Sequence, residues 1–233
     1  MSRHFSLHLV TEPRRTPEAL RAAIEQALDG GVDWVQLRDK GGSAAVVYQQ
    51  AEHLRRLTRA ATACLSINDR LDVALAVEAD GVHLAGQSLP VGPAARVGQG
   101  RLLVGRSVHG LAEARAAVAD GADYLTFGHV FPTQSHPGLP PHGLDELGQL
   151  VAQVEVPVLA IGGIGIHNLD SVLATGCAGI AVISAILSAS DPRAAAAQLR
   201  QALDSSPHRP RIPFRSPSGE QIHHARDRQP AAV

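Results

Sequence analysis

The chain has 233 residues with a formal net charge of −1, and 45% of its residues are hydrophobic but only 3% aromatic. This length suits one large α/β domain or two small ones and can bury a core. The balanced charge argues against nucleic acid as the main partner, because phosphate backbones attract a surplus of basic residues. Apolar runs fall short of the roughly 20 residues that cross a bilayer, no signal sequence is recognised, and Cys64 and Cys177 match no zinc or disulfide spacing. We therefore expect a globular, cytoplasmic protein that does not enter a membrane.

Short β-branched runs alternate with stretches of helical periodicity along most of the chain. The predicted strands are 8–11, 34–38, 64–68, 81–84, 102–105, 124–128, 158–161 and 179–184. The predicted helices are 17–29, 43–61, 69–79, 91–97, 111–119, 144–154, 166–174 and 192–203. Strict alternation of strands and helices in this number predicts a (β/α)8 TIM barrel of the α/β class.

Similar segments lead into every second predicted strand. They read DGGVDWVQLR from Asp29, EADGVHLA from Glu78, DGADYLTFG from Asp120 and TGCAGIAVIS from Thr175. Each places a glycine where a helix ends and a buried strand follows. A segment that recurs about once in every two strand–helix units favours a (β/α)8 barrel. The competing fold, a doubly wound sheet, would typically have a Gly-x-Gly-x-x-Gly turn after the first strand, and the sequence has none there.

The composition changes after residue 204. Residues 205–233 hold five Pro and five Arg with almost no apolar periodicity. Such a stretch cannot bury enough surface to offset the entropy lost on ordering. We expect a single barrel domain over 1–204 and a disordered Pro- and Arg-rich tail over 205–233. A metal or nucleic-acid contact through His223 and His224 is the less favoured alternative for the tail.

Polar residues at the ends of the strands are the candidates for an active site, because the loops of a TIM barrel gather there. Gln36, Arg38 and Lys40 share one face at period two and can bind an anion at the end of the second strand. Lys40 is also the only lysine in the chain. An internal ion pair with Asp39 or Asp69 is the alternative.

The third, fifth and sixth strands are followed by further polar candidates. Asn68 either contacts a ligand or caps the next helix. Ser107 can donate a hydrogen bond to a phosphate or carboxylate, or serve only as a turn residue. Thr133, Ser135 and His136 lie in a Pro- and Gly-rich loop able to fold over a ligand.

The sixth strand also carries Phe127, His129 and Phe131 in alternation, which predicts an imidazole between two aromatic rings on one face. Such an imidazole can hold a flat heterocycle and move protons near neutral pH. A packed structural histidine is the alternative.

The last two strands end in residues that suit a phosphate group. Gly162 and Gly163 let the backbone approach a ligand closely, and Ile183 and Ser184 follow at the next strand end. The loops after strands seven and eight are the usual phosphate site of this fold. These residues predict a phosphorylated small molecule as ligand.

Together these motifs resemble the thiamine phosphate synthase/TenI superfamily over residues 7 to about 204. The motifs are VQLRDK, INDR, ADGVHL, GRSVH, FGHVF, AIGGI and AVISAI. The resemblance implies one of two activities in thiamine biosynthesis. A thiamine phosphate synthase joins a pyrimidine diphosphate to a thiazole phosphate with Mg²⁺. A thiazole tautomerase of the TenI type aromatises a thiazole phosphate carboxylate without a metal.

Three departures from the synthase pattern favour the tautomerase. Ser88 stands where the synthase has a second acidic metal ligand, which leaves Asp69 as the only carboxylate of that pair. His136 replaces the lysine of the synthase loop PTxTK. The segment GHVF with His129 resembles the tautomerase, as does GRSVH, although the Thr-x-Ser pattern after the sixth strand remains synthase-like.

We therefore expect an isomerase, a thiazole tautomerase that needs no cofactor and in which His129 moves a proton from ring C2 to the exocyclic carbon. Its partner is a phosphorylated thiazole, and a homo-oligomer is left open. The alternatives are a Mg²⁺-dependent thiamine phosphate synthase, a transferase with Asp69 as metal ligand, or a non-catalytic ligand-binding regulator on the same fold. The expected substrate-binding residues are Gln36, Arg38, Lys40, Asn68, Ser107, Thr133, Ser135 and His136, and the expected phosphate-binding residues are Gly162, Gly163, Ile183 and Ser184.

Overall fold

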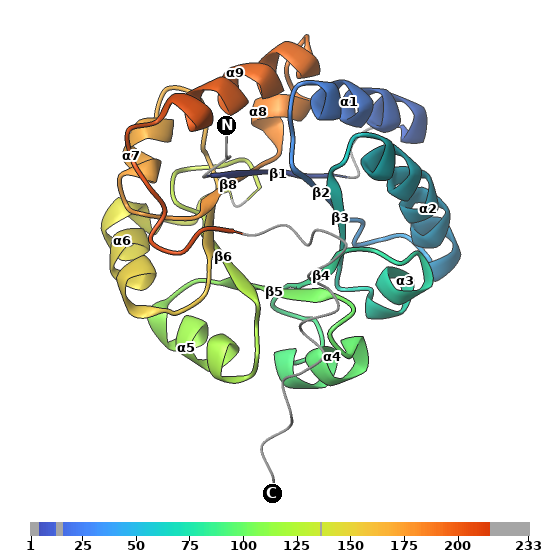
Figure 1. The fold of residues 1–233 in the computed structure, drawn as a ribbon, viewed down its shortest axis with the longest axis horizontal. Coiled ribbons are helices and arrows are strands. Elements are labelled where there is room, and N and C mark those ends of the chain that lie inside the picture. Colours follow the sequence, from blue (N-terminus) through green and yellow to red (C-terminus); the bar gives the residue numbers. More distant parts are fainter. Residues whose placement is uncertain (1–4, 13–15, 136, 215–233) are drawn as a thin grey trace, which may run out of the picture.

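The computed structural model describes residues 5–12, 16–135 and 137–214. Eight parallel strands form a closed barrel in which each strand pairs with the next and β8 pairs with β1. Figure 1 looks along the barrel, with the helices in a ring outside the strands. The strands are β1 (Ser6–Val10), β2 (Trp34–Leu37), β3 (Cys64–Asn68), β4 (Gly81–Leu84), β5 (Leu103–Val108), β6 (Tyr124–Gly128), β7 (Val158–Ile161) and β8 (Gly179–Val182).

The helices follow the strands in the expected order, so the predicted TIM barrel is confirmed. They are α1 (Pro17–Asp29), α2 (Ala44–Ala60), α3 (Leu71–Ala76), α4 (Val91–Gly98), α5 (Leu111–Ala119), α6 (Gly143–Gln153), α7 (Leu169–Leu173), α8 (Ser184–Leu187) and α9 (Pro192–Ser205). The short helix α8 was not predicted, because its residues were assigned to the end of the last strand and the loop beyond. None of the described helices is long and apolar enough to cross a membrane.

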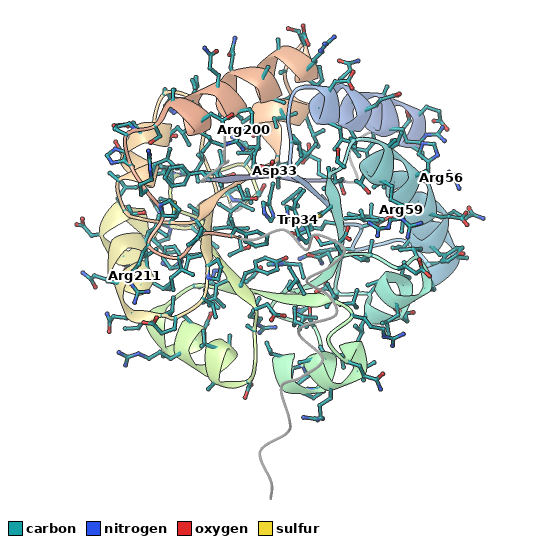
Figure 2. All side chains as sticks on the ribbon, viewed as in Figure 1. Asp33, Trp34, Arg56, Arg59, Arg200 and Arg211 are labelled. Carbon is teal, nitrogen blue, oxygen red and sulfur yellow. The ribbon has the colours of Figure 1, made fainter. Side chains whose placement is uncertain are left out.

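The two faces of the strands carry different chemistry. Outward side chains such as Val35 and Leu37 are at most 1% exposed and join the apolar layer beneath the helices. The inward face is more polar. His8 is buried there with its ring against Trp34 and Tyr124 from two other strands, and Figure 2 shows Trp34 inside the ring of strands. The barrel therefore has an apolar outer core and a mixed polar and aromatic interior.

Three of the repeated segments contain an aspartate just before their strand, and this aspartate connects adjacent strands. The carboxylates of Asp33, Asp80 and Asp123 each accept a hydrogen bond from a backbone N–H of the preceding strand, at 2.8 Å in all three cases. Asp33 also pairs with Arg200 of α9 at 2.9 Å, and the two residues lie close together in Figure 2. The sequence repeat thus places a carboxylate at the amino ends of the strands, where it holds two strands together because a carboxylate is a strong acceptor for backbone amides.

The segment that follows α9 corrects the prediction of a disordered tail from residue 205. The Arg211 guanidinium donates to the Val154 carbonyl oxygen at 2.5 Å and pairs with Glu155 at 2.6 Å. In Figure 1 the segment runs from α9 back to the ring of strands. The expectation of disorder was wrong for residues 205–214, because contacts with distant elements leave no periodicity in the sequence. Residues 215–233, with His223 and His224, lie outside the described residues.

Phe214 provides the apolar part of this attachment. Its ring lies edge-on against His8, Trp34 and Tyr124, at centroid distances of 4.9, 5.5 and 5.1 Å. Edge-to-face pairs at such distances stabilise a core beyond the area they bury. The C-terminal segment thereby covers the amino-terminal end of the barrel.

Replacement of Phe214 tests this attachment. We expect Phe214→Ala to lower the free energy of unfolding by about 2 kcal/mol, less than for a fully buried Phe because this ring is only partly buried. Urea unfolding measures the change. The control Val97→Ala, at an exposed position, should change stability by about 0.5 kcal/mol or less. Equal effects of the two substitutions would show that Phe214 is not part of the folded core.

Candidate active site

A cavity of about 670 Å³ opens at the carboxyl ends of the strands, and all eight strands contribute to its lining. Active sites of TIM barrels form at this end. The sequence-predicted site residues lie around it, except His136, which is outside the described residues. They are Gln36, Arg38, Lys40, Asn68, Ser107, His129, Thr133, Ser135, Gly162, Gly163, Ile183 and Ser184.

Arg38 and Lys40 give one side of this cavity a positive charge. The alternative expected for them, an internal ion pair, does not form within the described ranges, where no carboxylate lies within 4.0 Å of either cation. Asp39 instead accepts hydrogen bonds from the backbone N–H groups of Gly41 and Gly42, at 3.0 and 2.9 Å. Cations without a carboxylate partner in a concave site attract an anionic ligand.

Beside these cations, a chain of hydrogen bonds orients the polar side chains at the ends of β2 and β3. The Gln36 amide donates to Asn68 Oδ1 at 3.0 Å, and Asn68 Nδ2 donates to Asp69 Oδ2 at 2.6 Å. Both Gln36 and Asn68 are 6% exposed. Asn68 therefore faces the cavity with a fixed amide and does not cap α3, in which no side-chain cap is formed.

Asp69 is the carboxylate that a Mg²⁺ site would need, and its oxygens already have partners. Oδ1 accepts hydrogen bonds from the Ala85 N–H at 3.0 Å and from the Ser88 hydroxyl, and Oδ2 accepts from Asn68. The side chain is not part of the cavity lining. In the described residues no three His, Cys, Asp or Glu side chains gather as metal ligands. Because Mg²⁺ prefers carboxylate oxygens in octahedral geometry, these residues do not fit a magnesium site.

His129 follows β6 and lines the cavity, although its residue is only 6% exposed. Its Nε2 lies 3.3 Å from the Leu139 carbonyl oxygen. A carbonyl can only accept, so this contact places the proton of a neutral ring on Nε2 and the lone pair on Nδ1. The position of His129 also requires a glycine at residue 162. Gly162 has φ +98°, and a Cβ there would lie 2.3 Å from His129 Cβ.

The expected sandwich of His129 between Phe127 and Phe131 is wrong. Strand β6 ends at Gly128, so the alternation of side chains does not continue to residues 129 and 131. Phe127 is fully buried in the outer core, and neither phenylalanine lines the cavity. Among the described residues, the ring that meets His129 is another imidazole.

That partner is His142, which the sequence did not suggest as a site residue. Its ring lies 6.0 Å from those of His129 and His109, edge-on to the first and stacked on the second. His142 Nδ1 is 3.0 Å from a carboxylate oxygen of Glu146, and His109 Nδ1 is 2.7 Å from the Gly128 carbonyl oxygen. Two further imidazoles and a carboxylate thus lie beside the candidate base, and of these three groups only His109 lines the cavity.

Two further cavity residues, both within strands, were missed. His83 in β4 and Thr126 in β6 both line the cavity. The signal for His83 was available in the alternation of β4, where Val82 and Leu84 are apolar and point to the helices. Burial lowers the pKa of His83 to about 4, and burial followed by the charge of His83 lowers the pKa of His8 to about 3.

The family model for thiamine monophosphate synthase matches residues 7–186, which is most of the chain. The chain belongs to the thiamine monophosphate synthase family. A thiamine-phosphate synthase of Chloroflexus aurantiacus is 48% identical over 181 residues, or 77% of this chain and 83% of the relative. One of Pyrococcus abyssi is 40% identical over 200 residues, or 86% of this chain and 95% of the relative.

A solved structure, described as a thiamine phosphate pyrophosphorylase from Pyrococcus furiosus, superposes with a TM-score of 0.79 at 41% identity, covering 86% of this chain and 96% of that one. The expected superfamily is therefore confirmed, and the protein is an enzyme of the thiamine monophosphate synthase family. The expectation of greatest similarity to TenI is not supported by these names, which are synthase names. These names favour the thiamine phosphate synthase over the tautomerase.

The buried imidazoles predict how stability depends on pH. An unfolded histidine binds a proton below about pH 6.5, whereas His8 and His83 stay neutral in the folded state until about pH 3 and 4. The unfolded state thus binds more protons in this window, and stability is lost as the pH falls. Between pH 6.5 and 5 the wild-type free energy of unfolding should fall, and we expect His8→Phe to reduce this fall by about 1–2 kcal/mol, measured by urea unfolding at each pH. The exposed control His167→Gln should leave the slope unchanged, and an equal slope in both variants would contradict the assignment.

Proposed function

We propose that this protein is a thiazole tautomerase of thiamine biosynthesis, an isomerase acting on a carboxythiazole ethyl phosphate tautomer. The observation that carries the proposal is the contrast between His129, whose imidazole lines the cavity, and Asp69, whose carboxylate oxygens are engaged by the chain's own donors. Proton transfer needs the imidazole, whereas diphosphate chemistry needs the metal that Asp69 is poorly placed to hold.

The proposed reaction moves one proton within the substrate. His129 Nδ1 accepts the proton from ring C2, and the imidazolium then returns a proton to the exocyclic alkylidene carbon. The electrons of the C2–H bond enter the ring, which becomes aromatic, while the π electrons of the exocyclic double bond form the new C–H bond, and no electrons are gained or lost. The Leu139 carbonyl, 3.3 Å from Nε2, holds the ring in the tautomer that this step requires.

The anionic groups of such a substrate match the two ends of the cavity. Gly162, Gly163, Ile183 and Ser184 would hold the phosphate, with help from the hydroxyl groups of Thr133 and Ser135. The cations Arg38 and Lys40, together with Gln36, would surround the opposite end, where the substrate carries its carboxylate.

Thiamine phosphate synthase is the second candidate, and the names of the relatives support it better than they support the tautomerase. Relatives 40–48% identical to this chain carry that name. The loop after β6 also keeps Thr133 and Ser135 in the cavity lining. The reaction would require Mg²⁺, for which the residues present are a poor match.

Substitution of His129 tests the acid–base assignment. We expect His129→Asn to lower kcat for aromatisation about 10²–10⁴-fold, the usual contribution of a general acid–base group. Ultraviolet absorbance follows the conversion of the alkylidene thiazoline carboxylate phosphate to the aromatic ring. The control His53→Asn, on the outer helix α2, should retain wild-type turnover. Activity of His129→Asn within about threefold of wild type would remove His129 from the mechanism.

A second experiment separates the two enzymes. With EDTA present, we expect the tautomerase rate to stay within about twofold and inorganic phosphate to compete with the substrate, because the proposed phosphate site uses no metal. The same protein, given a pyrimidine diphosphate, a thiazole phosphate and Mg²⁺, should form no thiamine phosphate. Efficient, strictly Mg²⁺-dependent coupling would establish the synthase instead. Absence of turnover in both assays would support a ligand-binding regulator.

A further inference from the structure

Hydrogen bonds connect the active-site cavity with the opposite end of the barrel. Ser107 lines the cavity, and its Oγ lies 2.8 Å from His83 Nε2. The other ring nitrogen, His83 Nδ1, lies 3.2 Å from the hydroxyl oxygen of Tyr124 at the start of β6. His83 and Tyr124 are 2% and 1% exposed. Tyr124 does not line the cavity, so it can influence a ligand there only through His83 and Ser107.

The barrel holds the Tyr124 ring tightly. Gly105, opposite Tyr124 in the ladder between β5 and β6, leaves the space that the ring fills, because a Cβ there would lie 2.1 Å from Tyr124 Cζ and 2.5 Å from its hydroxyl oxygen. On the other side the ring meets Phe214 edge-on at 5.1 Å. The phenol hydroxyl therefore has a fixed position relative to His83.

The protonation states decide which way these hydrogen bonds point. Burial lowers the pKa of His83 to about 4 and raises the pKa of Tyr124, so both side chains are neutral near neutral pH. A neutral imidazole has one donor nitrogen and one acceptor nitrogen. A phenol is intrinsically a better donor than an aliphatic hydroxyl, which favours Tyr124 as the donor to Nδ1. His83 then carries its proton on Nε2 and donates to Ser107.

We propose that Tyr124 and His83 are positioning residues that fix Ser107 as a hydrogen-bond donor toward the ligand. Because Ser107 already accepts from His83, its own proton points to the cavity. The site then selects a ligand with an acceptor at this place, such as a ring nitrogen or a carboxylate oxygen, and disfavours an amino group. The inference rests on the proposed function for the identity of the ligand, since a carboxythiazole carries both kinds of acceptor.

The first test reads the His83 tautomer directly, without a ligand. Nitrogen-15 NMR of the histidine side chains in the full chain should show His83 protonated at Nε2 near neutral pH, with the signal assigned by its loss in His83→Gln. A proton on Nδ1 would overturn the proposal, because Ser107 would then donate to His83. This measurement needs no turnover, so failure of the proposed function leaves its outcome unaffected.

The second test asks whether Tyr124 acts through Ser107. We expect Ser107→Ala and Tyr124→Phe each to weaken binding of the aromatic carboxythiazole phosphate about threefold to tenfold, the effect of one neutral hydrogen bond. In calorimetry the double variant should bind within about twofold of Ser107→Ala, because the proposal has Tyr124 act on the ligand through the Ser107 hydroxyl. Tyr48→Phe, at the only other tyrosine, removes a half-exposed hydroxyl and should not change binding.

A merely structural role for Tyr124 gives a different result. The losses from Tyr124→Phe and Ser107→Ala would then multiply in the double variant, and that outcome would overturn the proposal. If wild-type protein neither binds nor converts the thiazole, the proposed function fails, and the tautomer of His83 alone decides whether the positioning pair exists.

Discussion

Polar side chains occupy the interior of this barrel, and burial favours hydrogen bonds among them, although His8 Nε2 has no such partner within the described residues. A buried hydroxyl or imidazole without a partner costs more than its hydrogen bond would contribute. Ser107, His83 and Tyr124 satisfy this requirement in a single line from the cavity inward. Gln36 and Asn68 satisfy it in a second line that ends on Asp69. The active site is therefore the outer end of networks whose geometry is set by the interior of the fold.

The architecture could be predicted from sequence because it depends on local patterns. Alternating strand and helix periods and glycine-terminated repeats specify a parallel barrel, and every expected strand is present. The attachment of residues 205–214 could not be predicted, since Arg211 and Phe214 find their partners far away in the chain. A single aromatic side chain that fills a distant gap produces no periodicity.

The site was predicted at polar residues in the last positions of the strands or just beyond them, including Gln36, Asn68 and Ser107. Arg38, Lys40 and His129 were found by position and line the cavity. His83 was overlooked because it stands among apolar residues of a buried strand. The expected ring sandwich at His129 failed because the strand ends one residue earlier. Family membership and the names of relatives establish a role in thiamine biosynthesis. The choice between tautomerase and synthase depends on single positions such as Ser88, whose hydroxyl donates to Asp69.

The position of Phe214 also bears on the order in which the molecule is completed during synthesis. His8 and Trp34 leave the ribosome early, whereas the ring that covers them emerges some 180 or more residues later. Until then the amino-terminal end of the barrel stays open to water, and its imidazole and indole lack their final neighbour. Contacts between such distant parts of a chain close slowly. The polar interior of this barrel thus reaches its final form only after translation of nearly the whole described chain.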